Sequence, residues 1–383
     1  MRQDGFWRSL RTAACMALAL SPLPGCSETT DEPGESAGGL PKQRIVSADF
    51  LEQKLSVLDY RQVIAGPGSA ADVTAKTIDL AAYAPGPLQL ELTPDGERAL
   101  VAVGPGFYDS LGVLFGFPDV SGDGALLIVD LNDDSVSSVP TASAPMGVAI
   151  TPDGRYGLSA NFGTKTAGGS TLTRVDLETQ SVVEEVDVGG SPEQVRLFDG
   201  SLGLLNTASE GGVRRFDPAD VEGSLSGVAP TSADPSDIAF VSATRAVVID
   251  SRNVAGYSVV TLDDSDPGIT VVEQVPTDGL PYGICHIPGT SEVLVGIATG
   301  TPTKVLRVDV GSTPSTEVTS YELGNTESTF VINVSCSPDG KFAFAPIPNQ
   351  NALAVIDLET NGVHQITGWT HSAPTYVGVF LGQ

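Results

Sequence analysis

Short runs in which apolar and polar residues alternate recur along residues 43 to 383, and two kinds of run each occur seven times. Alternation over four to eight residues indicates β-strands, and the 43 glycines and 27 prolines of the chain supply frequent turns. The first kind leads, in most copies, into a Pro-Asp-Gly type turn and begins at Pro87, Pro145, Pro192, Pro235, Pro281, Val331 and Pro374. The second kind ends in aspartate, at Asp59, Asp130, Asp176, Asp217, Asp263, Asp309 and Asp357.

The spacing of these marks predicts the architecture. From Asp130 onward the aspartates follow one another after 46, 41, 46, 46 and 48 residues, which is the range of repeats built from four short strands. Seven such units predict an all-β fold, a seven-bladed β-propeller with four antiparallel strands in each blade. We expect each strand-end aspartate to accept a hydrogen bond from the amide two residues later and so to shape the turn.

The two ends of the repeat region predict how the ring closes. Residues 374 to 382 read as a first strand with nothing after it, whereas residues 44 to 80 supply second, third and fourth strands without a first. We therefore expect the C-terminal strand to join the N-terminal strands in one blade, which removes the exposed sheet edges of an open ring.

Two stretches carry a resemblance to a known family. PMGVAITPDGRYGLSAN, from Pro145 to Asn161, and SPDGKFAFAPIPNQNALAVIDLETNG, from Ser337, resemble the repeats of YVTN-type β-propellers of the lactonase-like superfamily. Where that family has Tyr-Val-Thr-Asn, this chain has Leu-Ser-Ala-Asn at residues 158–161. The resemblance covers nearly all of residues 42 to 383. It implies the propeller fold, but relatives include both lactonase-like enzymes and surface or binding proteins.

The N-terminal segment has the pattern of an export signal. Arg2, Arg8 and Arg11 precede an apolar run at residues 13–20, which is too short to span a bilayer. Leu-Pro-Gly-Cys at residues 23–26 resembles a bacterial lipobox, which implies cleavage after residue 25 and lipidation of Cys26. We expect residues 1–25 to be a signal peptide, 26–42 a flexible tether and 43–383 the propeller, anchored at the cell envelope, with the outer membrane favoured.

Charge limits the partners. The net charge of −27 and the isoelectric point near 4.2 argue against nucleic acid and anionic surfaces, which are recognised by clusters of Lys and Arg. Acidity of this kind is typical of an exposed, soluble domain. We expect a monomer that contacts the membrane through lipid on Cys26 and binds a protein, peptide or saccharide ligand.

The longest insertion, residues 104–124, suggests a ligand site. Loops between second and third strands share one face with the connections between blades, and functional residues concentrate on such loops. An aromatic, partly polar mouth on that face suits a sugar or peptide. Capping of the channel by the aromatics, and packing of the tryptophan between blades, are the alternatives. The candidate ligand-binding residues are Phe107, Tyr108, Phe115, Phe117, Asn161, Trp369 and His371.

Within that insertion, DVSGDG at residues 119–124 has the outline of a calcium loop. Asp119, Ser121 and Asp123 would be ligands, but Asp130, the apparent twelfth position, is a strand-end aspartate about 20 Å further along an extended strand. A glycine-rich turn is the main interpretation, with a weak cation site as the alternative, and we expect no other cofactor.

Recognisable catalytic motifs are missing from the sequence. His286, which occupies a first-strand position filled elsewhere by apolar residues, is expected to be packed along the channel. No metal-protease, nucleophile-elbow, paired-cysteine or phosphate-loop motif is present, so no catalytic residue can be assigned. A cluster of His, Glu or Arg at the channel mouth would indicate a hydrolase. Aromatic and main-chain groups would indicate a binding protein, which the aromatic insertion favours.

Two cysteines remain for the folded region. Cys285 and Cys336 lie in the first strands of adjacent blades, with opposite side-chain parity, so that they can face each other or both point away. An oxidising envelope allows a disulfide, and two buried thiols are the alternative.

Overall fold

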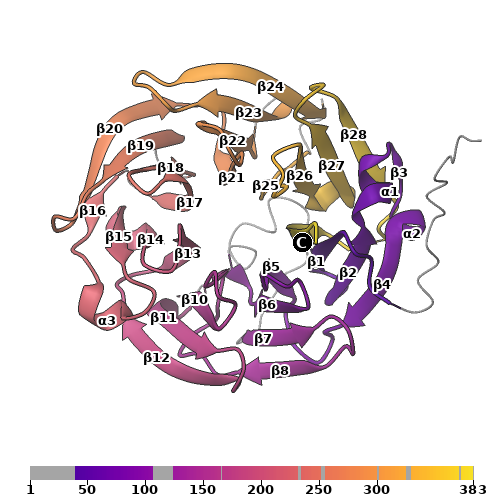
Figure 1. The fold of residues 1–383 in the computed structure, drawn as a ribbon, viewed down its shortest axis with the longest axis horizontal. Coiled ribbons are helices and arrows are strands. Elements are labelled where there is room, and N and C mark those ends of the chain that lie inside the picture. Colours follow the sequence, from indigo (N-terminus) through magenta and orange to yellow (C-terminus); the bar gives the residue numbers. More distant parts are fainter. Residues whose placement is uncertain are drawn as a thin grey trace, which may run out of the picture. The chain divides into compact units, whose positions relative to one another are not determined.

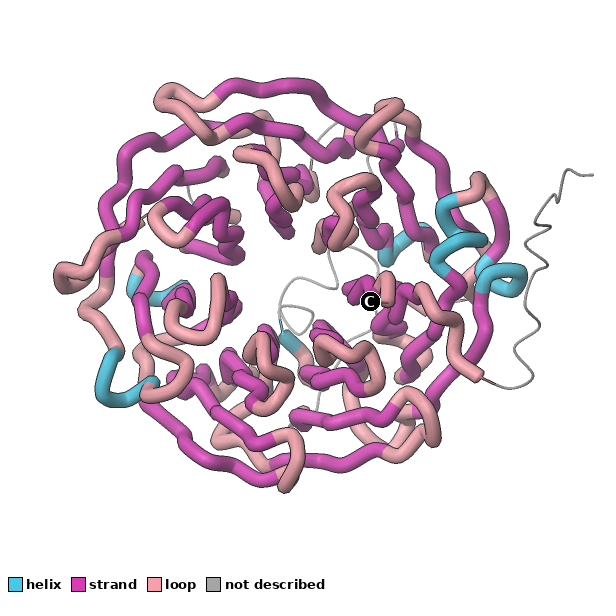
Figure 2. Tube along the Cα trace, in the orientation of Figure 1, coloured by secondary structure: helices cyan, strands magenta, loops and turns pink. Residues whose placement is uncertain are grey.

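Seven antiparallel sheets form a ring in the unit from Gly38 to Gln383 (Figure 1). The computed structural model describes residues 39–106, 124–164, 166–231, 234–251, 255–299, 302–324, 329–370 and 372–382. Strands form most of this unit, and the helical turns α1, α2 and α3 lie at its outer edge (Figure 2). The predicted seven-bladed β-propeller is therefore confirmed.

Each blade runs from an innermost to an outermost strand. The innermost strands are β5 (Pro87–Leu92), β9 (Gly147–Ile150), β13 (Pro192–Leu197), β17 (Pro235–Ser242), β21 (Pro281–His286), β25 (Ser335–Cys336) and β29 (Pro374–Phe380). The second strands are β6 (Arg98–Val103), β10 (Tyr156–Gly163), β14 (Gly203–Thr207), β18 (Arg245–Asp250), β22 (Glu292–Ile297), β26 (Phe342–Ile347) and β1 (Arg44–Asp49). The third strands are β7 (Ala125–Asp130), β11 (Gly168–Asp176), β15 (Gly212–Phe216), β19 (Gly256–Leu262), β23 (Thr303–Asp309), β27 (Ala352–Asp357) and β2 (Lys54–Asp59). The outermost strands are β8 (Val136–Val139), β12 (Ser181–Asp187), β16 (Ala229–Pro230), β20 (Ile269–Pro276), β24 (Thr316–Gly324), β28 (Val363–Thr367) and β4 (Thr74–Asp79).

The ring closes as the sequence predicts. Strand β29 pairs antiparallel with β1, with Arg44 opposite Phe380 and Val46 opposite Gly378. The Arg44 guanidinium also lies 4.5 Å from the centre of the Phe380 ring and donates a hydrogen bond to the carbonyl of Gly96 in the neighbouring blade. The last and first segments of the propeller therefore share one sheet, so that the facing edges of β1 and β29 are both hydrogen-bonded.

A second contact between the N-terminal and C-terminal blades, which the sequence did not predict, lies outside the closing sheet. The connection from β2 to β4 carries α1 (Tyr60–Ile64), β3 (Gly68–Ser69) and α2 (Ala70–Val73). Strand β3 pairs in parallel with β28 of the preceding blade, and His364 Nε2 lies 2.9 Å from the carbonyl oxygen of Val63. Because β28 would otherwise present a free edge, this connection covers part of it.

The seven strand-end aspartates have the predicted role. In every blade the Oδ1 atom accepts a hydrogen bond from the amide two residues later, at 2.8–2.9 Å; the donors are Arg61, Asn132, Glu178, Ala219, Ser265, Gly311 and Glu359. The Pro-Asp-Gly turns also behave as expected, since Gly96, Gly154 and Gly340 have φ near +70°.

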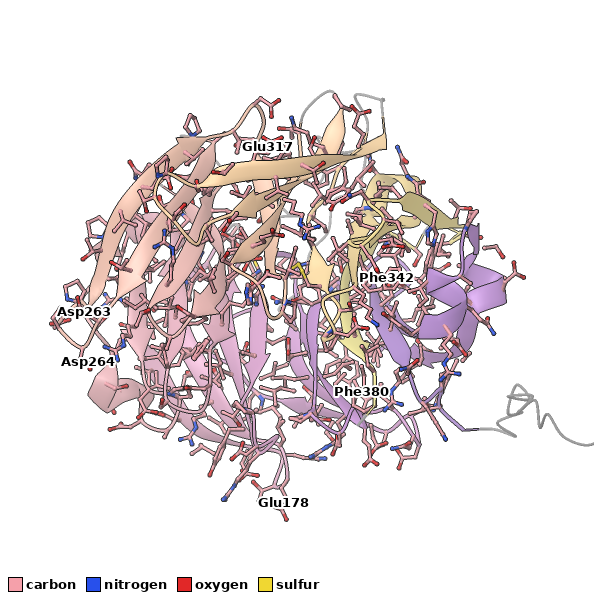
Figure 3. All side chains as sticks on the ribbon, turned by 45° about the horizontal axis from the view of Figure 1, so that its top comes forward. Glu178, Asp263, Asp264, Glu317, Phe342 and Phe380 are labelled. Atoms are coloured by element: carbon pink, nitrogen blue, oxygen red, sulfur yellow. A yellow bond between two sulfur atoms is a disulfide. The ribbon has the colours of Figure 1, made fainter. Side chains whose placement is uncertain are left out.

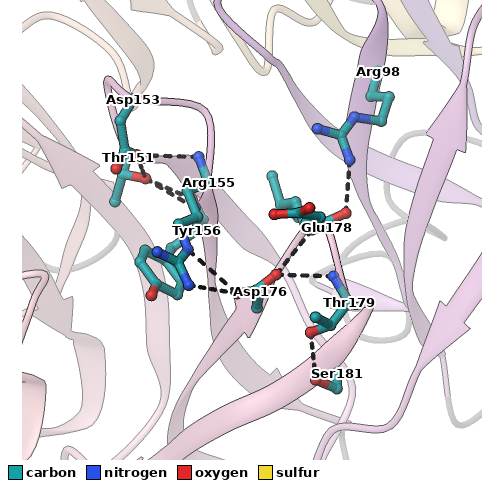
Figure 4. Close-up of polar contacts among 10 residues, drawn as sticks. Arg98, Thr151, Asp153, Arg155, Tyr156, Asp176, Glu178, Thr179 and Ser181 are labelled. Carbon is teal, nitrogen blue, oxygen red and sulfur yellow. Dashed lines mark hydrogen bonds and ion pairs between the residues drawn. The ribbon is translucent and has the colours of Figure 1, made fainter.

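Asp176 illustrates these turns (Figure 4). Its carboxylate accepts hydrogen bonds from the amides of Glu178 and Thr179, both at 2.9 Å, and Arg155 Nε lies 3.4 Å from Oδ2. The amide of Thr179 in particular lowers the pKa of Asp176, although partial burial opposes this effect. Arg98 of the neighbouring blade donates to the carbonyl of Leu177 at 2.6 Å, so the turn also joins two blades.

Apolar side chains between the sheets form the core. One cluster joins the closing sheet to the next blade and includes Val46, Leu55, Leu90, Val101 and Leu127, all fully buried. Alternating inward positions of neighbouring sheets supply these residues, as period-2 strands require. Within the described residues, no helix is long and apolar enough to cross a membrane.

Candidate functional site in the central channel

The two faces of the ring differ in the connections they carry. The turns from first to second strands and from third to fourth strands share one face, here called the turn face. The other connections share the opposite face, here called the loop face. The expected ligand site lies on the loop face, whereas the polar cavity described below opens on the turn face.

The cavity occupies the turn-face end of the central channel and measures about 670 Å³. It opens between the inner turns that hold Pro94, Pro288 and Pro338. Apolar side chains from the inner strands of several blades form part of its wall: Leu92, Leu197, Ile238, Phe240, Ile284, Val334, Val377 and Val379. A space of this size and wall chemistry can hold a ring-sized organic molecule.

An arginine held by an aspartate lies at the floor of the cavity. Arg196 Nη2 on β13 is 2.9 Å from Asp237 Oδ1 on β17, and the two side chains are 17% and 4% exposed. The same Asp237 oxygen accepts a hydrogen bond from the amide of Ile238 at 2.8 Å. Burial raises the pKa of Asp237, and Arg196 opposes that rise by favouring the carboxylate. The pair is therefore fixed in place, while part of the Arg196 side chain remains accessible from the cavity.

Two uncharged groups complete the floor. In the amide orientation that satisfies both its atoms, Gln89 on β5 accepts from Arg196 Nη1 at 2.8 Å and donates to Gln194 Oε1 at 2.8 Å. Burial raises the pKa of Tyr376 on β29, whose hydroxyl also contacts Gln89. Donors and acceptors from four blades thus converge on one level of the channel.

Glu91 is the acidic group of the cavity wall. It lies on β5 two residues beyond Gln89, is half-buried, and its carboxylate accepts no hydrogen bond from a described residue. Burial raises the pKa of Glu91 to about 7, against the opposing effect of Arg196. This carboxyl group can therefore gain or lose a proton near neutral pH while facing the cavity.

Below the floor the channel narrows. A space of only about 30 Å³, about the volume of one water molecule, lies between Gln89, Asp237 and Tyr282. The hydroxyl of Tyr282 donates a hydrogen bond to Glu193, which is fully buried. Towards the loop face, an apolar plug fills the channel; it consists of Phe50, Leu88, Met146, Tyr282, Ala298, Phe330, Ile332 and Ala373. The cavity is therefore accessible from the turn face.

Asn161 does not lie where the sequence led us to expect it. Its side chain is fully buried, accepts from Ser159 Oγ at 3.0 Å and donates to Thr171 and Thr173 at 2.8 and 2.7 Å. These bonds use the amide group within the sheet and join β10 to β11. The expectation that Asn161 is exposed at a ligand-binding mouth is wrong, because the side chain is needed inside the blade.

Trp369 is likewise buried. It is 6% exposed and packs with Tyr60, Val63 and Phe344 between the closing sheet and the blade of β25–β28. Packing between blades, the alternative considered from the sequence, describes its position. The remaining candidate residues, Phe107, Tyr108, Phe115, Phe117, Asp119, Ser121, Asp123 and His371, lie outside the described residues, as does Cys26.

The cavity wall also carries a disulfide and a histidine. The Sγ atoms of Cys285 and Cys336 are 2.09 Å apart, and the bond joins β21 to β25 of the next blade. His286, expected to be packed along the channel, lies on the innermost strand but is only half-buried; its Nε2 is 2.7 Å from the carbonyl oxygen of Thr290. Among the described residues, no group of three or more His, Cys, Asp or Glu side chains could hold a metal ion.

Sequence reasoning missed the polar floor although a signal was present. Gln89 and Glu91 lie two and four positions after the proline that begins β5, and Gln194 and Arg196 occupy the same positions in β13. Asp237 and Tyr376 lie two positions after their own strand prolines; at this place two other repeats have Gly147 and Gly283. Polar residues at equivalent positions of innermost strands indicate a polar channel, whereas the candidate residues predicted from the sequence lie mainly in loops.

Comparisons with known proteins agree with this architecture. No protein-family model matches the sequence, and no curated protein matches it in sequence. Among solved structures, the periplasmic gluconolactonase PpgL of Pseudomonas aeruginosa superposes with a TM-score of 0.63 at 16% identity, over 88% of this chain and 98% of that one. A candidate 6-phosphogluconolactonase of Bacteroides fragilis gives 0.64 at 13% identity, over 91% and 100%.

The chain also superposes on a protein whose name gives a different activity. Kuenenia stuttgartiensis hydrazine synthase superposes with a TM-score of 0.62 at 16% identity, over 90% of this chain and 99% of that one. One propeller fold thus supports unrelated reactions, and function has to be argued from the site. The comparisons and the seven sheets together show that this chain has the seven-bladed β-propeller fold found in lactonase-like propellers.

Proposed function

We propose that this protein hydrolyses a ring lactone in the cavity of the turn face. The observation that carries the proposal is the half-buried Glu91 carboxyl group, which faces a ring-sized cavity beside Arg196 and accepts no hydrogen bond from a described residue. A cluster of Glu, Arg and His at a channel mouth is the arrangement expected for a hydrolase. The fold shared with lactonase-like propellers supports the choice of substrate class.

Each step can be assigned to a group of the cavity. Glu91, as a carboxylate, would accept a proton from a water molecule as its oxygen attacks the lactone carbonyl carbon. The carbonyl oxygen then gains negative charge, which N–H donors of Arg196 and the hydroxyl of Tyr376 would stabilise. When the ring C–O bond breaks, protonated Glu91 returns its proton to the leaving oxygen. The product is a hydroxy acid, and Glu91 is regenerated.

The pH dependence follows from the state that Glu91 must have. The base is the deprotonated form, and burial raises its pKa to about 7 against the effect of Arg196. The other titratable groups at this level are Asp237 and Tyr376, and burial raises the pKa of each, against the opposing effect of Arg196. Hydrolysis should therefore increase with pH up to about 7 and then level off.

A pair of matched variants tests this function. We expect Glu91→Gln to lower kcat for glucono-1,5-lactone by about 100-fold or more, since general bases commonly contribute that much. Glu322→Gln, on the exposed side of outermost strand β24, removes the same charge far from the cavity and should leave kcat unchanged. Initial rates above the spontaneous hydrolysis rate measure both. Equal rates for Glu91→Gln and the unaltered protein would contradict the proposal.

Binding without turnover is the second candidate function. The combination of apolar wall residues with a small set of convergent polar groups favours it, because ligand pockets are commonly built this way. In this case a lactone or saccharide ring would bind with similar affinity to the unaltered protein and to Glu91→Gln, and no hydrolysis would occur. Calorimetric titration beside the rate assay separates the two functions.

We also propose that the protein is exported and anchored by lipid on Cys26. The support is the signal-like pattern of residues 1–25, the lipobox-like Leu-Pro-Gly-Cys and the tether-like composition of residues 26–42. Incorporation of labelled palmitate into the unaltered protein, but not into Cys26→Ser, is the expected result. Fractionation of the membranes then tests the proposed outer-membrane location.

A further inference from the structure

The charges around the cavity restrict the ligand that it can accept. Among the described residues lining it, Arg196 is the one permanently charged cation, and Asp237 binds that cation at 2.9 Å. Glu91 is a second carboxyl group near the same guanidinium. The cavity therefore carries two carboxyl groups against one guanidinium, which leaves no positive charge unpaired for an anionic substituent.

The rim of the cavity strengthens this imbalance. The inner turns around its mouth contain four aspartates, Asp95, Asp153, Asp199 and Asp339, against one lysine, Lys341, and the strand-end aspartates form a second circle on the same face. Figure 3 shows Glu178, Asp263 and Asp264 projecting from such turns at the periphery. Carboxylates gathered on one face produce a negative potential, which attracts cations and repels anions that approach the opening.

The arginines of this face are already engaged with protein groups. Arg44 donates to the carbonyls of Pro41 and Gly96, Arg98 to the carbonyl of Leu177, and Arg155 pairs with Asp176. Arg245 donates to the carbonyl of Ser312. Phosphate recognition by proteins depends on Arg or Lys donors directed at the phosphate oxygens, and none of these four side chains lines the cavity.

We infer that the cavity selects an uncharged ring lactone and rejects phosphorylated lactones. This inference rests on the proposed function, because it concerns the substrate of the same cavity. A phosphate group would have to approach Glu91 and Asp237 and displace water without gaining a cationic partner. An uncharged ring can instead use Arg196 and Tyr376 as hydrogen-bond partners while its carbon skeleton contacts apolar side chains of the wall.

Two pairs of probes test the charge preference. The first pair is glucono-1,5-lactone and its 6-phosphate, compared by kcat/KM. The second pair is the matching lactams, which cannot be hydrolysed in the same way, compared by Kd in calorimetry. We expect the uncharged member of each pair to be favoured by about tenfold or more, the effect of one unfavourable charge contact of about 1.4 kcal/mol. Raising the salt concentration should narrow the difference, because salt screens the repulsion.

Two variants should weaken the preference. Asp237→Asn removes the carboxylate that neutralises Arg196. Leu197→Lys places a cation on the cavity wall without altering the floor. Each variant should raise the affinity for the phosphorylated lactam, relative to the uncharged lactam, about tenfold. Leu197→Lys keeps the test valid if Asp237→Asn fails to fold. Glu322→Gln, on the exposed side of outermost strand β24, is the matched control and should change the ratio less than about twofold.

The outcomes separate the two proposals. Absence of lactone hydrolysis, with preferential binding of the uncharged lactam, would overturn the proposed reaction and support the charge selection. Hydrolysis with equal or better use of the phosphorylated lactone would support the reaction and overturn the charge selection. Binding of neither lactam would overturn the selection as well, since it requires an uncharged ring to bind.

Discussion

The two ends of the central channel differ in chemistry. At the turn-face end, Glu91 and Arg196 line an open cavity, and the buried Asp237 binds Arg196. At the loop-face end, Phe50, Phe330 and neighbouring apolar side chains form a buried plug. Strand β5 contributes to both ends, with Glu91 at the cavity and Leu88 in the plug, so position along a strand decides which environment a side chain meets. Within a few residues along one strand, the surroundings thus change from a polar cavity to a buried apolar cluster.

The connections follow the same division. The turn face is crowded with aspartates because each blade needs carboxylates to fix its two tight turns. The described loop-face connections contain few charged residues, and Glu52, Glu210 and Asp278 each pair with a nearby cation. Among the described residues, carboxylates are therefore numerous on the turn face, as a consequence of turn chemistry.

The largest stability effect should come from breaking the polar floor. Arg196→Leu leaves the buried Asp237 carboxylate without its partner, and we expect a loss of about 3–5 kcal/mol in the free energy of unfolding. Arg155→Leu removes an exposed partner of a turn aspartate and should have a far smaller effect. Chemical denaturation of both variants measures the difference. Similar losses would show that the floor is not a buried charge pair.

The apolar plug should matter for stability but not for chemistry. Phe50 is fully buried at the loop-face end, so Phe50→Ala should cost about 3–5 kcal/mol through lost contacts and a cavity. Where the variant remains folded, kcat for the lactone should be unchanged, because the plug lies beyond the polar floor. A strong loss of kcat in folded protein would show that the two ends are coupled.

The disulfide should contribute at the cavity end. Cys285 and Cys336 close a loop with a sequence separation of 51 residues, and removal of such a bond commonly costs about 2–4 kcal/mol. We expect Cys285→Ser with Cys336→Ser to lower the free energy of unfolding by that amount. Alkylation after denaturation without reductant checks the bond itself, because labelling of both cysteines in the unaltered protein would exclude it.

The two sets of carboxyl groups should respond oppositely to pH. Hydrogen bonds lower the pKa of Asp263 and Asp309, so their stabilising contribution is present above pH 4 and is lost as the pH falls through the lowered values. Glu91 has a pKa raised to about 7, so its contribution decreases as the pH rises from about 4.5 to 7. Thermal unfolding of Glu91→Gln should lack this second decrease, whereas Glu322→Gln should retain it.

The smallest effect should come from a single turn. Asp309 Oδ1 accepts from the amide of Gly311 at 2.9 Å and from Ser291 Oγ at 2.7 Å, but the turn is largely exposed. Asp309→Ala should therefore cost about 1 kcal/mol or less, as expected for the loss of a solvated capping interaction. Asp309→Asn, which keeps an acceptor, should restore part of it. A loss as large as that of Arg196→Leu would remove the distinction between turn and floor.

The sequence alone determined the seven-fold repeat, the strand-end turns and the pairing of the first and last segments. These features depend on local periodicity and on turn residues that recur at fixed intervals, so they can be recognised without knowing which residues meet in space. Asn161, Trp369 and the polar floor could not be placed in this way. Their roles depend on contacts between residues far apart in sequence, such as Asn161 with Thr171 and Thr173 or Arg196 with Asp237.

Only the tertiary structure decided where the chemistry lies. Glu91, Arg196 and Asp237 each interrupt an ordinary apolar strand, and any one of them could have been a surface residue. Closure of the ring brings β5, β13, β17 and β29 to a common channel, where burial changes the properties of their carboxyl and hydroxyl groups. Local patterns specify the blades, whereas the shared channel exists only after all seven blades are assembled.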